Sequence, residues 1–462
     1  MQLRVSERRL VLMAGDALAV ILAVVIALYI WSLNADDPFD VDFVLPQSYW
    51  FFVLTILWLV LASANDFYEL SLAANRVASL QRLGLITGQM LIVYLMVFFL
   101  SPRDALPRLF ILYYGMASFL LIGIWRVINP ALVGWAAAAR RVLIVGADES
   151  AVSLIRAIQH HGGDAYDVRG IIGAHEDVGR MIEGVPVLGS GSDLLNYVLR
   201  DQVSEVVVTS IPEMDGDVFR DLMQAYEHGV SIVPMPLLYA RITGRVPVKY
   251  VNNNWALVLP VAGHTIFNPY PAAQRVMDVI LSLIGLVVLV ILLPFIALLI
   301  RLDSPGPVFY RQVRTGLNGQ NFRLVKFRTM VANAEHDGRA RFAEPGDPRV
   351  TRVGRFLRKS RLDELPQVMN VLRGQMSVVG PRPERPEHID RLTENIPFYR
   401  TRLVVRPGLT GWAQVQYHYG SDDVDALVKL EYDLYYIRNQ SILLDINIII
   451  RTVYKVLRLG GL

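Results

Sequence analysis

Two adjacent acids, Asp363 and Glu364, stand in a stretch crowded with arginine and lysine. A carboxylate that attacks a phosphate meets like-charge repulsion, so it needs cations to neutralise that charge and to stabilise the transition state. Basic side chains can supply them, and so can Mg²⁺, which binds one or two carboxylates together with phosphate oxygens and water. The pattern therefore predicts a magnesium-assisted carboxylate nucleophile that acts on an activated phosphate.

Three basic residues are placed to bind phosphate oxygens. Lys326 and Arg328 alternate in "FRLVKFRTM", so they share one face if this segment is a strand. Arg382 lies in "GPRP" (380–383), a stiff turn from which a guanidinium can bind phosphate through two hydrogen bonds. Paired cations of this kind suit a diphosphate.

A structural interpretation of the two acids competes with the chemical one. Pro366 is tolerated only in the first turn of a helix, so both acids lie at or near a helix N-terminus, where the helix dipole favours carboxylates. Taken alone, these residues favour a capping acid followed by a first-turn acid. The helix would carry an apolar stripe made of Leu362, Leu365, Val368, Met369 and Leu372.

The elements that position these residues belong to a membrane protein. The apolar fraction is 53%, the mean hydropathy is +0.38, and the net charge of +3 is too small to indicate a nucleic-acid partner. The absence of cysteine excludes disulfides, thiolate metal sites and cysteine nucleophiles.

We expect four transmembrane helices within residues 1–135, because four apolar segments there approach spanning length. They are Val11–Leu33, Tyr49–Ala64, Leu83–Leu100 and Leu109–Ile128.

Basic residues predict the orientation of these helices. Arg8 and Arg9 precede the first segment, and the acidic loop "NADDPFDVDFVLPQS" follows it. Arg126, Arg140 and Arg141 follow the fourth segment. The N-terminus and everything after residue 140 are therefore expected in the cytoplasm.

Residues 140–250 predict a Rossmann-like α/β domain. Strand-like "RRVLIVG", "VRGIIG", "SEVVVTS" and "VSIVPMP" alternate with helical segments near 150–160, 193–201 and 215–228. "GADESA" (146–151) stands where a dinucleotide fingerprint would lie, but Asp148 replaces the second glycine that lets the backbone approach a pyrophosphate. We therefore predict a domain that serves regulation or self-association and does not bind a dinucleotide.

A fifth apolar run lies within residues 275–301. It is long enough to cross a membrane, yet Arg275 and Arg301 place basic charge at both ends. Pro294 removes a backbone donor and predicts a kink, and Asp278 is within reach of Arg275 at i,i+3. These features leave two paths open, an ordinary fifth span and a re-entrant helix whose ends both lie in the cytoplasm.

Three motifs together resemble a known family. "KFRTM" (326–330), "SRLDELPQVMNVLRGQMSVVGPRP" (360–383) and "RPGLTGWAQV" (406–415), in this order and spacing, resemble the bacterial polyprenyl-phosphate sugar-phosphate transferases. These are the large monotopic phosphoglycosyl transferases that begin exopolysaccharide, capsule and O-antigen synthesis. The resemblance implies a catalytic domain over 265–462 with a re-entrant membrane helix at 275–301. The four spans and the α/β domain resemble the subfamily typified by undecaprenyl-phosphate glucose or galactose phosphotransferases.

The resemblance implies a two-step reaction. Asp363 would attack the sugar-bearing phosphorus of a UDP-sugar, with UDP-glucose or UDP-galactose expected, and UMP would leave. Undecaprenyl phosphate would then take the phosphosugar from Asp363. Mg²⁺ is implied beside Asp363, and Glu364 would assist through the metal or the acceptor's protonation. The motif cations expected to hold phosphates are Lys326, Arg328, Arg382 and Arg406.

The same resemblance implies a place in the cell. It predicts a multi-pass protein of the bacterial inner membrane that contacts membrane lipid, with the middle and catalytic domains in the cytoplasm. It is also consistent with a homodimer.

The sequence departs from the family's pattern in two places. Leu293 occupies a position where the family often has serine before Pro294, and "QYHYGSD" (416–422) does not match the segment expected there.

Two other functional classes were weighed against this one. A membrane-bound nucleotide-sugar oxidoreductase or epimerase would need an intact glycine fingerprint and a Tyr-x-x-x-Lys pair near the sheet. Asp148 interrupts the first, and none of the tyrosines at 166, 197, 226, 239 and 250 has a lysine four residues later. A non-catalytic scaffold of polysaccharide export would not need an acid pair among cations.

Overall fold

The computed structural model describes residues 5–35, 38–65, 67–68, 72–73, 76–100, 109–132, 139–162, 165–209, 216–250, 268–331, 347–417 and 422–457. Residues 418–421 of the unmatched "QYHYGSD" motif lie outside these ranges. The chain divides into two compact units, 1–139 and 140–462.

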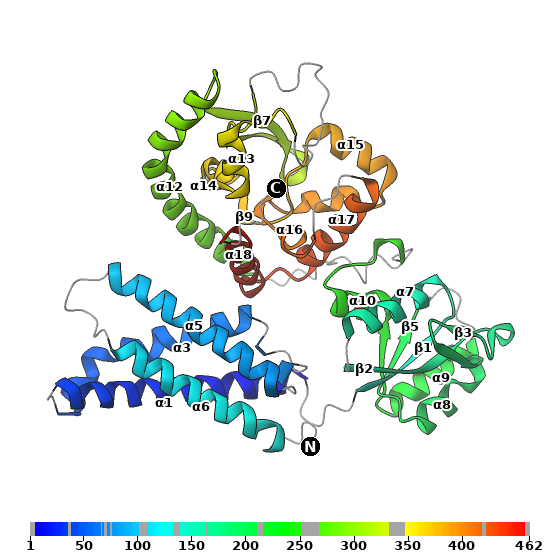
Figure 1. Ribbon diagram of the computed structural model, residues 1–462. Helices are drawn as coiled ribbons and strands as arrows, with labels where there is room; N and C mark the ends of the chain where they lie inside the picture. The colour runs from blue at the N-terminus through cyan, green and yellow to red at the C-terminus, as the bar shows by residue number, and fades with distance from the viewer. Residues whose placement is uncertain are drawn as a thin grey trace. The chain divides into compact units, whose positions relative to one another are not determined.

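The N-terminal unit consists of apolar helices, drawn in blue to cyan in Figure 1. They are α1 (Val5–Ala35), α2 (Val41–Val44), η1 (Leu45–Gln47), α3 (Tyr49–Ala64), α5 (Arg76–Leu100) and α6 (Phe110–Leu132). By length and composition, α1 and α6 can each cross a membrane, and so can α3 together with the short helices before it, which meet it at 45°. These helices associate the unit with a membrane, and the number of four crossings stays a prediction.

Arg126 corrects one detail of the orientation argument. It does not lie after the fourth segment but inside α6, where its Nη2 donates to Asp16 Oδ2 of α1 at 2.6 Å. The side chains of Arg126 and Asp16 are 2% and 0% exposed, and the guanidinium lies 3.9 Å from the ring centroid of Phe67. Ionised groups among apolar helices pair with one another, so helix packing explains the position of Arg126. Arg126 therefore does not indicate which end of α6 faces the cytoplasm.

The middle part of the second unit is a six-stranded sheet of order β3-β4-β2-β1-β5-β6. All neighbours are parallel except β3 and β4, which form an antiparallel pair at one edge. The strands are β1 (Arg140–Val145), β2 (Tyr166–Ile172), β3 (Met181–Ile182), β4 (Val185–Gly189), β5 (Glu205–Val208) and β6 (Ser231–Pro234). The four expected strands are present, and the sequence analysis missed the short β3 and β4.

Helices cover both faces of this sheet, as Figure 1 shows. Val142 and Ile144 pack toward α7 and α10, whereas Leu143 and Val145 pack toward α8 and α9, because side chains alternate along a strand. The helical segments are α7 (Glu149–Ala157), η2 (Ile158–Gly162), η4 (His175–Asp177), η5 (Gly191–Asp193), α8 (Leu194–Arg200), α9 (Gly216–Glu227), α10 (Met235–Thr243) and η6 (Val248–Tyr250).

Asp148 caps α7 with its own side chain. Its Oδ1 accepts hydrogen bonds from Ala151 N at 3.2 Å and Ser150 Oγ at 2.7 Å. A carboxylate therefore stands at the helix N-terminus, where a dinucleotide site would present N–H groups to a pyrophosphate. This arrangement agrees with the expectation that the domain binds no dinucleotide, which stays a prediction.

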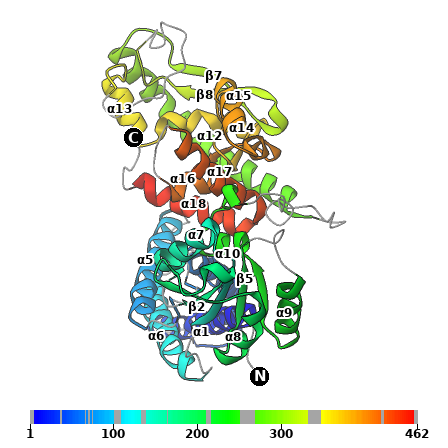
Figure 2. The ribbon, with the colours of Figure 1, turned by 90° about the vertical axis from the view of Figure 1, so that its right-hand side faces the viewer.

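The C-terminal part is mainly helical, with two small sheets. Figure 2 shows β7 and β8 beside α15. Its elements are α12 (Tyr270–Asp303), β7 (Phe309–Thr315), η8 (Leu317–Gly319), β8 (Asn321–Phe327), α13 (Arg352–Lys359), η9 (Leu362–Gln367), α14 (Val368–Leu372), β9 (Ser377–Val379), α15 (Pro386–Asn395), η10 (Tyr399–Val404), β10 (Gly408–Thr410), α16 (Trp412–Gln416), α17 (Asp423–Arg438) and α18 (Ile442–Leu457). β7 and β8 form an antiparallel hairpin, and β9 pairs in parallel with β10.

One apolar cluster joins the middle and C-terminal parts. After α10, Val246 N donates to the backbone oxygen of Glu431 at 3.0 Å, and Trp412 Nε1 donates to Gly244 O at 2.8 Å. Val246 and Val248 are buried in the same apolar cluster as residues of α16 and α17. These contacts contribute to the compactness of 140–462, and the division into 140–250 and 265–462 stays a prediction.

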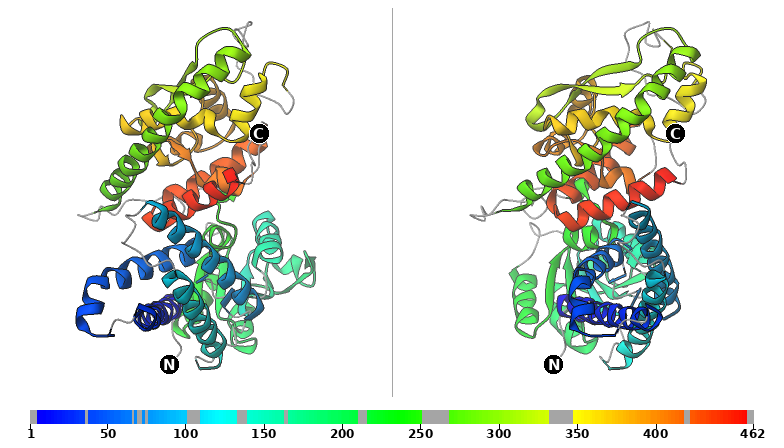
Figure 3. Two further views of the ribbon diagram at one scale, coloured as in Figure 1. Left: turned by 60° about the vertical axis from the view of Figure 1, so that its left-hand side comes forward. Right: turned by 90° about the vertical axis from the view of Figure 1, so that its left-hand side faces the viewer.

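Helix α12 follows the C-terminal part along its outer side, as Figures 1 and 3 show. Near its start, Arg275 donates to Val371 O and Leu372 O, both at 2.7 Å, and at its end Asp303 Oδ2 accepts from Val353 N at 2.8 Å. The helix is uninterrupted at Pro294, and Figure 1 shows it curved. Because one domain holds both ends of this apolar helix, the packing favours the re-entrant path, which stays a prediction.

Candidate active site

Three elements bring the predicted site together. Lys326 comes from β8, Glu364 from η9 and Arg382 from the turn after β9. Lys326 Nζ donates to Glu364 Oε1 at 2.8 Å, and Arg382 Nη2 donates to the same oxygen at 2.9 Å. One carboxylate oxygen thus holds two of the expected phosphate-binding cations side by side.

The two acids lie in a 3₁₀ helix and not in the first turn of an α-helix. Asp363 and Glu364 are each 8% exposed, and the period of three residues per turn aligns them with the buried Pro366 and Gln367. No side chain caps η9, so the capping interpretation of Asp363 is wrong. Arg361, with φ of 60°, precedes η9 and turns the chain into it from α13. A non-glycine residue in this conformation is strained, as is common beside functional groups.

The Asp363 carboxylate is uncommitted within the described part of the chain, where no residue donates a hydrogen bond to it or pairs with it. Burial and, after it, the adjacent Glu364 carboxylate together raise the pKa of Asp363 to about 6. The positive charges of Lys326, Arg358 and Arg382 oppose that rise. Asp363 is therefore ionised at neutral pH and open to a partner that the protein itself does not supply.

Glu364 titrates in the opposite direction. Burial opposes its ionisation, but the positive charges of Arg382, Lys326 and Arg361 outweigh burial and hold its pKa well below the usual range. Glu364 is thus a permanent anion within the site. It organises the cations, and it leaves Asp363 as the acid that can change partner.

The donor set near Asp363 fits Mg²⁺ in one specific way. Within the described residues, no three His, Cys, Asp or Glu side chains gather to form a metal cage. Mg²⁺ does not require one, since it commonly binds one or two carboxylates and completes its shell with substrate phosphates and water. A single uncommitted carboxylate beside cations that are predicted to bind phosphate suits that mode, and Asp363 would be the protein ligand.

A small hollow lies beside these cations. Its lining includes Lys326 and Arg382 together with Arg314, Gln367 and Gly408. A second hollow shares Arg382 and continues along the turn toward Arg402. The expected stiff turn at 380–383 therefore presents its arginine at an accessible surface.

Arg328 corrects the sequence analysis. β8 ends at Phe327, and the Arg328 guanidinium donates to Pro305 O at 2.5 Å and Ser304 O at 2.7 Å. A further donation reaches Ile300 O at 3.4 Å. The carbonyl end of a helix attracts a cation, so Arg328 secures the end of α12 and does not join Lys326. We withdraw Arg328 from the phosphate-binding set.

Replacing Arg328 should therefore affect stability and not substrate binding. Arg328→Lys keeps the charge but cannot hold three carbonyls, so we expect the free energy of unfolding to fall by about 1–3 kcal/mol. Thermal unfolding in detergent measures this change. A raised KM for the nucleotide sugar with unchanged unfolding would return Arg328 to the site.

The remaining predicted residues lie on α12 or interact with it. Asp278 Oδ1 accepts from Ser377 Oγ at 2.9 Å and Val378 N at 2.8 Å, which fixes α12 to β9. The positive charges of Arg275 and Arg406 act on this carboxylate. Arg406 is half-buried beside Asp278 and has no bond to Glu364 within the described residues. Pro294 lies within α12.

The sequence analysis missed Arg358. It lies on α13, its Nε donates to Thr329 Oγ1 at 2.9 Å, and its charge acts directly on Asp363. The signal was present, since Arg358 precedes the acid pair by five residues among other cations. Between α13 and η9 the chain turns at Arg361, which has a positive φ.

Comparisons with known proteins identify the family. Residues 270–459 match the family model described as bacterial sugar transferase, and residues 63–236 match one described as CoA-binding domain. A UDP-N-acetylgalactosamine-undecaprenyl-phosphate N-acetylgalactosaminephosphotransferase from Aeromonas hydrophila is 44% identical, covering 47% of this chain and 50% of that protein.

Two further relatives extend the comparison. A UDP-glucose:undecaprenyl-phosphate glucose-1-phosphate transferase from Xanthomonas campestris pv. campestris is 35% identical, covering 69% of this chain and 66% of that protein. An exopolysaccharide production protein from Rhizobium leguminosarum bv. phaseoli is 42% identical over 40% of this chain and 96% of that protein. The chain thus spans between half and two thirds of the first two relatives.

Proposed function

This chain belongs to the bacterial sugar transferase family, and we propose that it transfers a hexose 1-phosphate from a UDP-sugar to undecaprenyl phosphate. The observation that carries the proposal is the uncommitted Asp363 carboxylate beside a permanent anion, Glu364, that holds Lys326 and Arg382. The names of the relatives support both substrate classes. The product would begin exopolysaccharide, capsule or O-antigen synthesis.

The first step is attack by an oxygen of Asp363 on the sugar-bearing phosphorus of the UDP-sugar. A new P–O bond forms, the bond to the bridging oxygen breaks, and UMP leaves with the electron pair. Lys326 and Arg382 bind the phosphate oxygens and reduce the repulsion between the two anions. The phosphosugar remains on Asp363 as an acyl phosphate.

The second step returns the carboxylate. An oxygen of undecaprenyl phosphate attacks the same phosphorus, and Asp363 leaves as a carboxylate with the electron pair. The product is undecaprenyl diphosphate sugar. Glu364 keeps the cations in place for both steps, because its charge persists throughout. Mg²⁺ held by Asp363 and the substrate phosphates would supply further neutralisation of the phosphate charge.

Activity should fall in acid because Asp363 must be ionised to attack. Its pKa of about 6 predicts that the UMP-forming rate falls about tenfold per pH unit below that value. Titration of Asp363 itself does not destabilise the fold in this range, since a raised folded-state pKa means that protonation favours the folded protein. Rapid measurement of kcat/KM from pH 4.5 to 8 tests this, and a flat profile would contradict it. The acid limb should move to lower pH as the Mg²⁺ concentration rises.

The direct test uses the full-length protein in detergent with Mg²⁺ and a panel of UDP-sugars, including UDP-glucose, UDP-galactose and UDP-N-acetylgalactosamine. We expect UMP release that becomes catalytic when a polyprenyl phosphate is added. A stoichiometric burst without the acceptor indicates the acyl phosphate. No UMP with any sugar would overturn the proposal.

The membrane arrangement is proposed with the same reasoning. A UDP-sugar is cytoplasmic, so the second unit would face the cytoplasm from a multi-pass anchor in the bacterial inner membrane. Helix α12, held at both ends by one domain, would enter and leave the lipid on that side. The middle domain would have a Rossmann-like architecture and serve regulation or self-association, in keeping with a homodimer.

A further inference from the structure

The turn that presents Arg382 is held along its whole backbone. Four consecutive carbonyl groups, from residue 381 to residue 384, each accept a hydrogen bond from another part of the domain. These bonds are Gly408 N to Pro381 O at 2.8 Å, Arg402 Nη2 to Arg382 O at 3.1 Å, Arg314 Nη1 to Pro383 O at 3.0 Å and Thr315 N to Glu384 O at 2.9 Å. The position of Arg382 is therefore imposed by its surroundings as well as by the flanking prolines.

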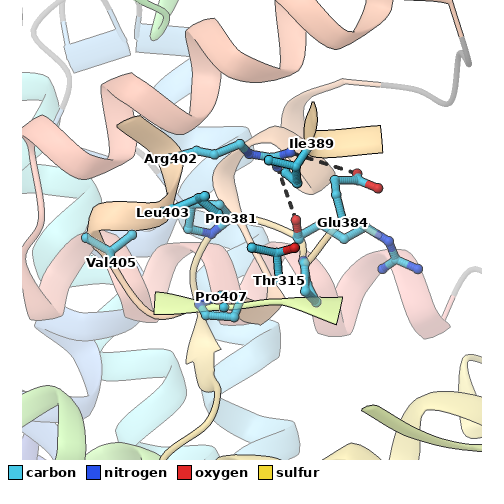
Figure 4. A pocket seen from close by; sticks show the side chains of 11 residues that line it. Thr315, Pro381, Glu384, Ile389, Arg402, Leu403, Val405 and Pro407 are labelled. Atoms are coloured by element: carbon cyan, nitrogen blue, oxygen red, sulfur yellow. Dashed lines mark hydrogen bonds and ion pairs between the residues drawn. The ribbon is translucent and has the colours of Figure 1, made fainter. Parts of the chain in front are cut away.

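Arg402 is the buried arginine among these donors. Besides Arg382 O, its Nη2 donates to Asp433 Oδ2 of α17 at 2.7 Å, and its Nη1 donates to Tyr399 OH at 2.8 Å. In Figure 4 its side chain points toward Glu384, whose carboxylate is 4.0 Å away. The side chains of Arg402 and Asp433 are 6% and 2% exposed, so neither can touch a nucleotide.

A buried ion pair does not by itself indicate a gain in stability, because its replacement by well-packed apolar residues often leaves the free energy of unfolding unchanged or raises it. Apolar residues cannot, however, donate hydrogen bonds to a carboxylate and a carbonyl oxygen at the same time, as the planar guanidinium of an arginine does. Arg402 makes that bridge between α17 and the backbone of Arg382 itself. The next contact outward is Arg382 Nη2 with Glu364 Oε1, beside Asp363.

We propose that Arg402, oriented by Asp433, is a positioning residue that sets the Arg382 guanidinium against Glu364 and so aligns a sugar-nucleotide diphosphate for attack. The inference rests on the proposed function and deepens it. Arg402 acts only by fixing the position of the turn. The loss of activity caused by replacing Arg402 should therefore depend on which residue stands at position 382.

A double-mutant cycle tests this dependence. Arg402→Lys keeps the charge near Asp433 but loses the fork, and we expect kcat for UMP release to fall by about 10- to 100-fold. Arg382→Lys retains a cation on a flexible stem, which depends less on where the turn lies. In that background Arg402→Lys should cost less than about threefold. Equal losses in the two backgrounds would overturn the proposal.

Arg400→Lys is the matched control. Arg400 lies two residues from Arg402 in the same helix η10, but it is exposed and its ion pair with Asp390 is 3.9 Å long. We expect its kcat and KM to equal those of the unaltered protein. If Arg400→Lys loses as much as Arg402→Lys, the effect belongs to the helix and the proposal fails.

Hydrogen exchange supplies a readout that does not depend on activity. Asp433→Asn releases Arg402, so the amides of Thr315 and Gly408 should exchange about tenfold faster, while those of the distant strand β1 keep their rates. Unchanged exchange at both amides contradicts the positioning role even if activity falls. A chain that releases no UMP from any UDP-sugar defeats the proposed function, whereas an active chain with additive losses defeats only this inference.

Discussion

Asp363→Asn is expected to lower UMP release by about 10³-fold or more, with little change in folding. The substitution removes the attacking charge but keeps the size of the side chain, and loss of a nucleophile typically costs this much or more. Because the Asp363 carboxylate holds no hydrogen bond or ion pair to other described residues, the amide leaves no partner unpaired. Thermal unfolding should be nearly unchanged.

Two measurements distinguish this prediction from a general loss of function. Incubation with a UDP-sugar labelled in its sugar should give a covalent adduct, sensitive to hydroxylamine, on the unaltered protein and none on Asp363→Asn. Asp390→Asn is the control, since Asp390 is 74% exposed and lies on α15, and it should retain both activity and adduct. An adduct on Asp363→Asn would refute the assignment of the nucleophile.

Glu364→Gln is expected to lower kcat by about 10²-fold, through the cations and not through a lost nucleophile. The amide cannot hold Lys326 and Arg382 as an anion does, so both cations lose the partner that places them beside Asp363. The adduct should still form, only slowly. A kcat within twofold of the unaltered protein would show that Glu364 does not organise the site.

The pH dependence gives this second variant its own signature. The Glu364 carboxylate raises the pKa of Asp363, so its removal should move the acid limb of the rate profile to lower pH. Glu387→Gln is a suitable control because Glu387 is 66% exposed and pairs only with Arg385 at 3.5 Å in the described structure. Its profile should be unchanged.

Short sequence patterns were enough to predict the structure where a single strand or turn decides it. The strand-like segment "RRVLIVG" carries a continuous apolar run at residues 142–145, and β1 packs helices on each face. Asn318 and Gly319, a pair typical of hairpin turns, lie with positive φ between β7 and β8. The stiff "GPRP" turn and the adjacent acids were also recognised from the sequence as parts of the candidate active site, where Arg382 contacts Glu364.

Local signals failed where tertiary contacts override periodicity. The apolar stripe beginning at Leu362 predicted an α-helix with a capping acid and a first-turn acid at its start, but the chain forms a 3₁₀ helix that buries both acids. Strand alternation placed Arg328 beside Lys326, but the strand ends one residue earlier and the end of α12 takes the guanidinium. Arg402 and Asp433 gave no signal, because they are distant in sequence and meet only through the fold.

The sequence by itself determined the chemistry available to this protein: two adjacent carboxylates, the cations around them and the apolar helices that carry them to a membrane. Residue type and short spacing are enough for that, because charge and hydropathy are local properties. Only the tertiary structure decided which acid is free and which is held. That difference arises because burial and the placement of Lys326 and Arg382 act on Glu364, and no periodicity in the chain records where those side chains converge.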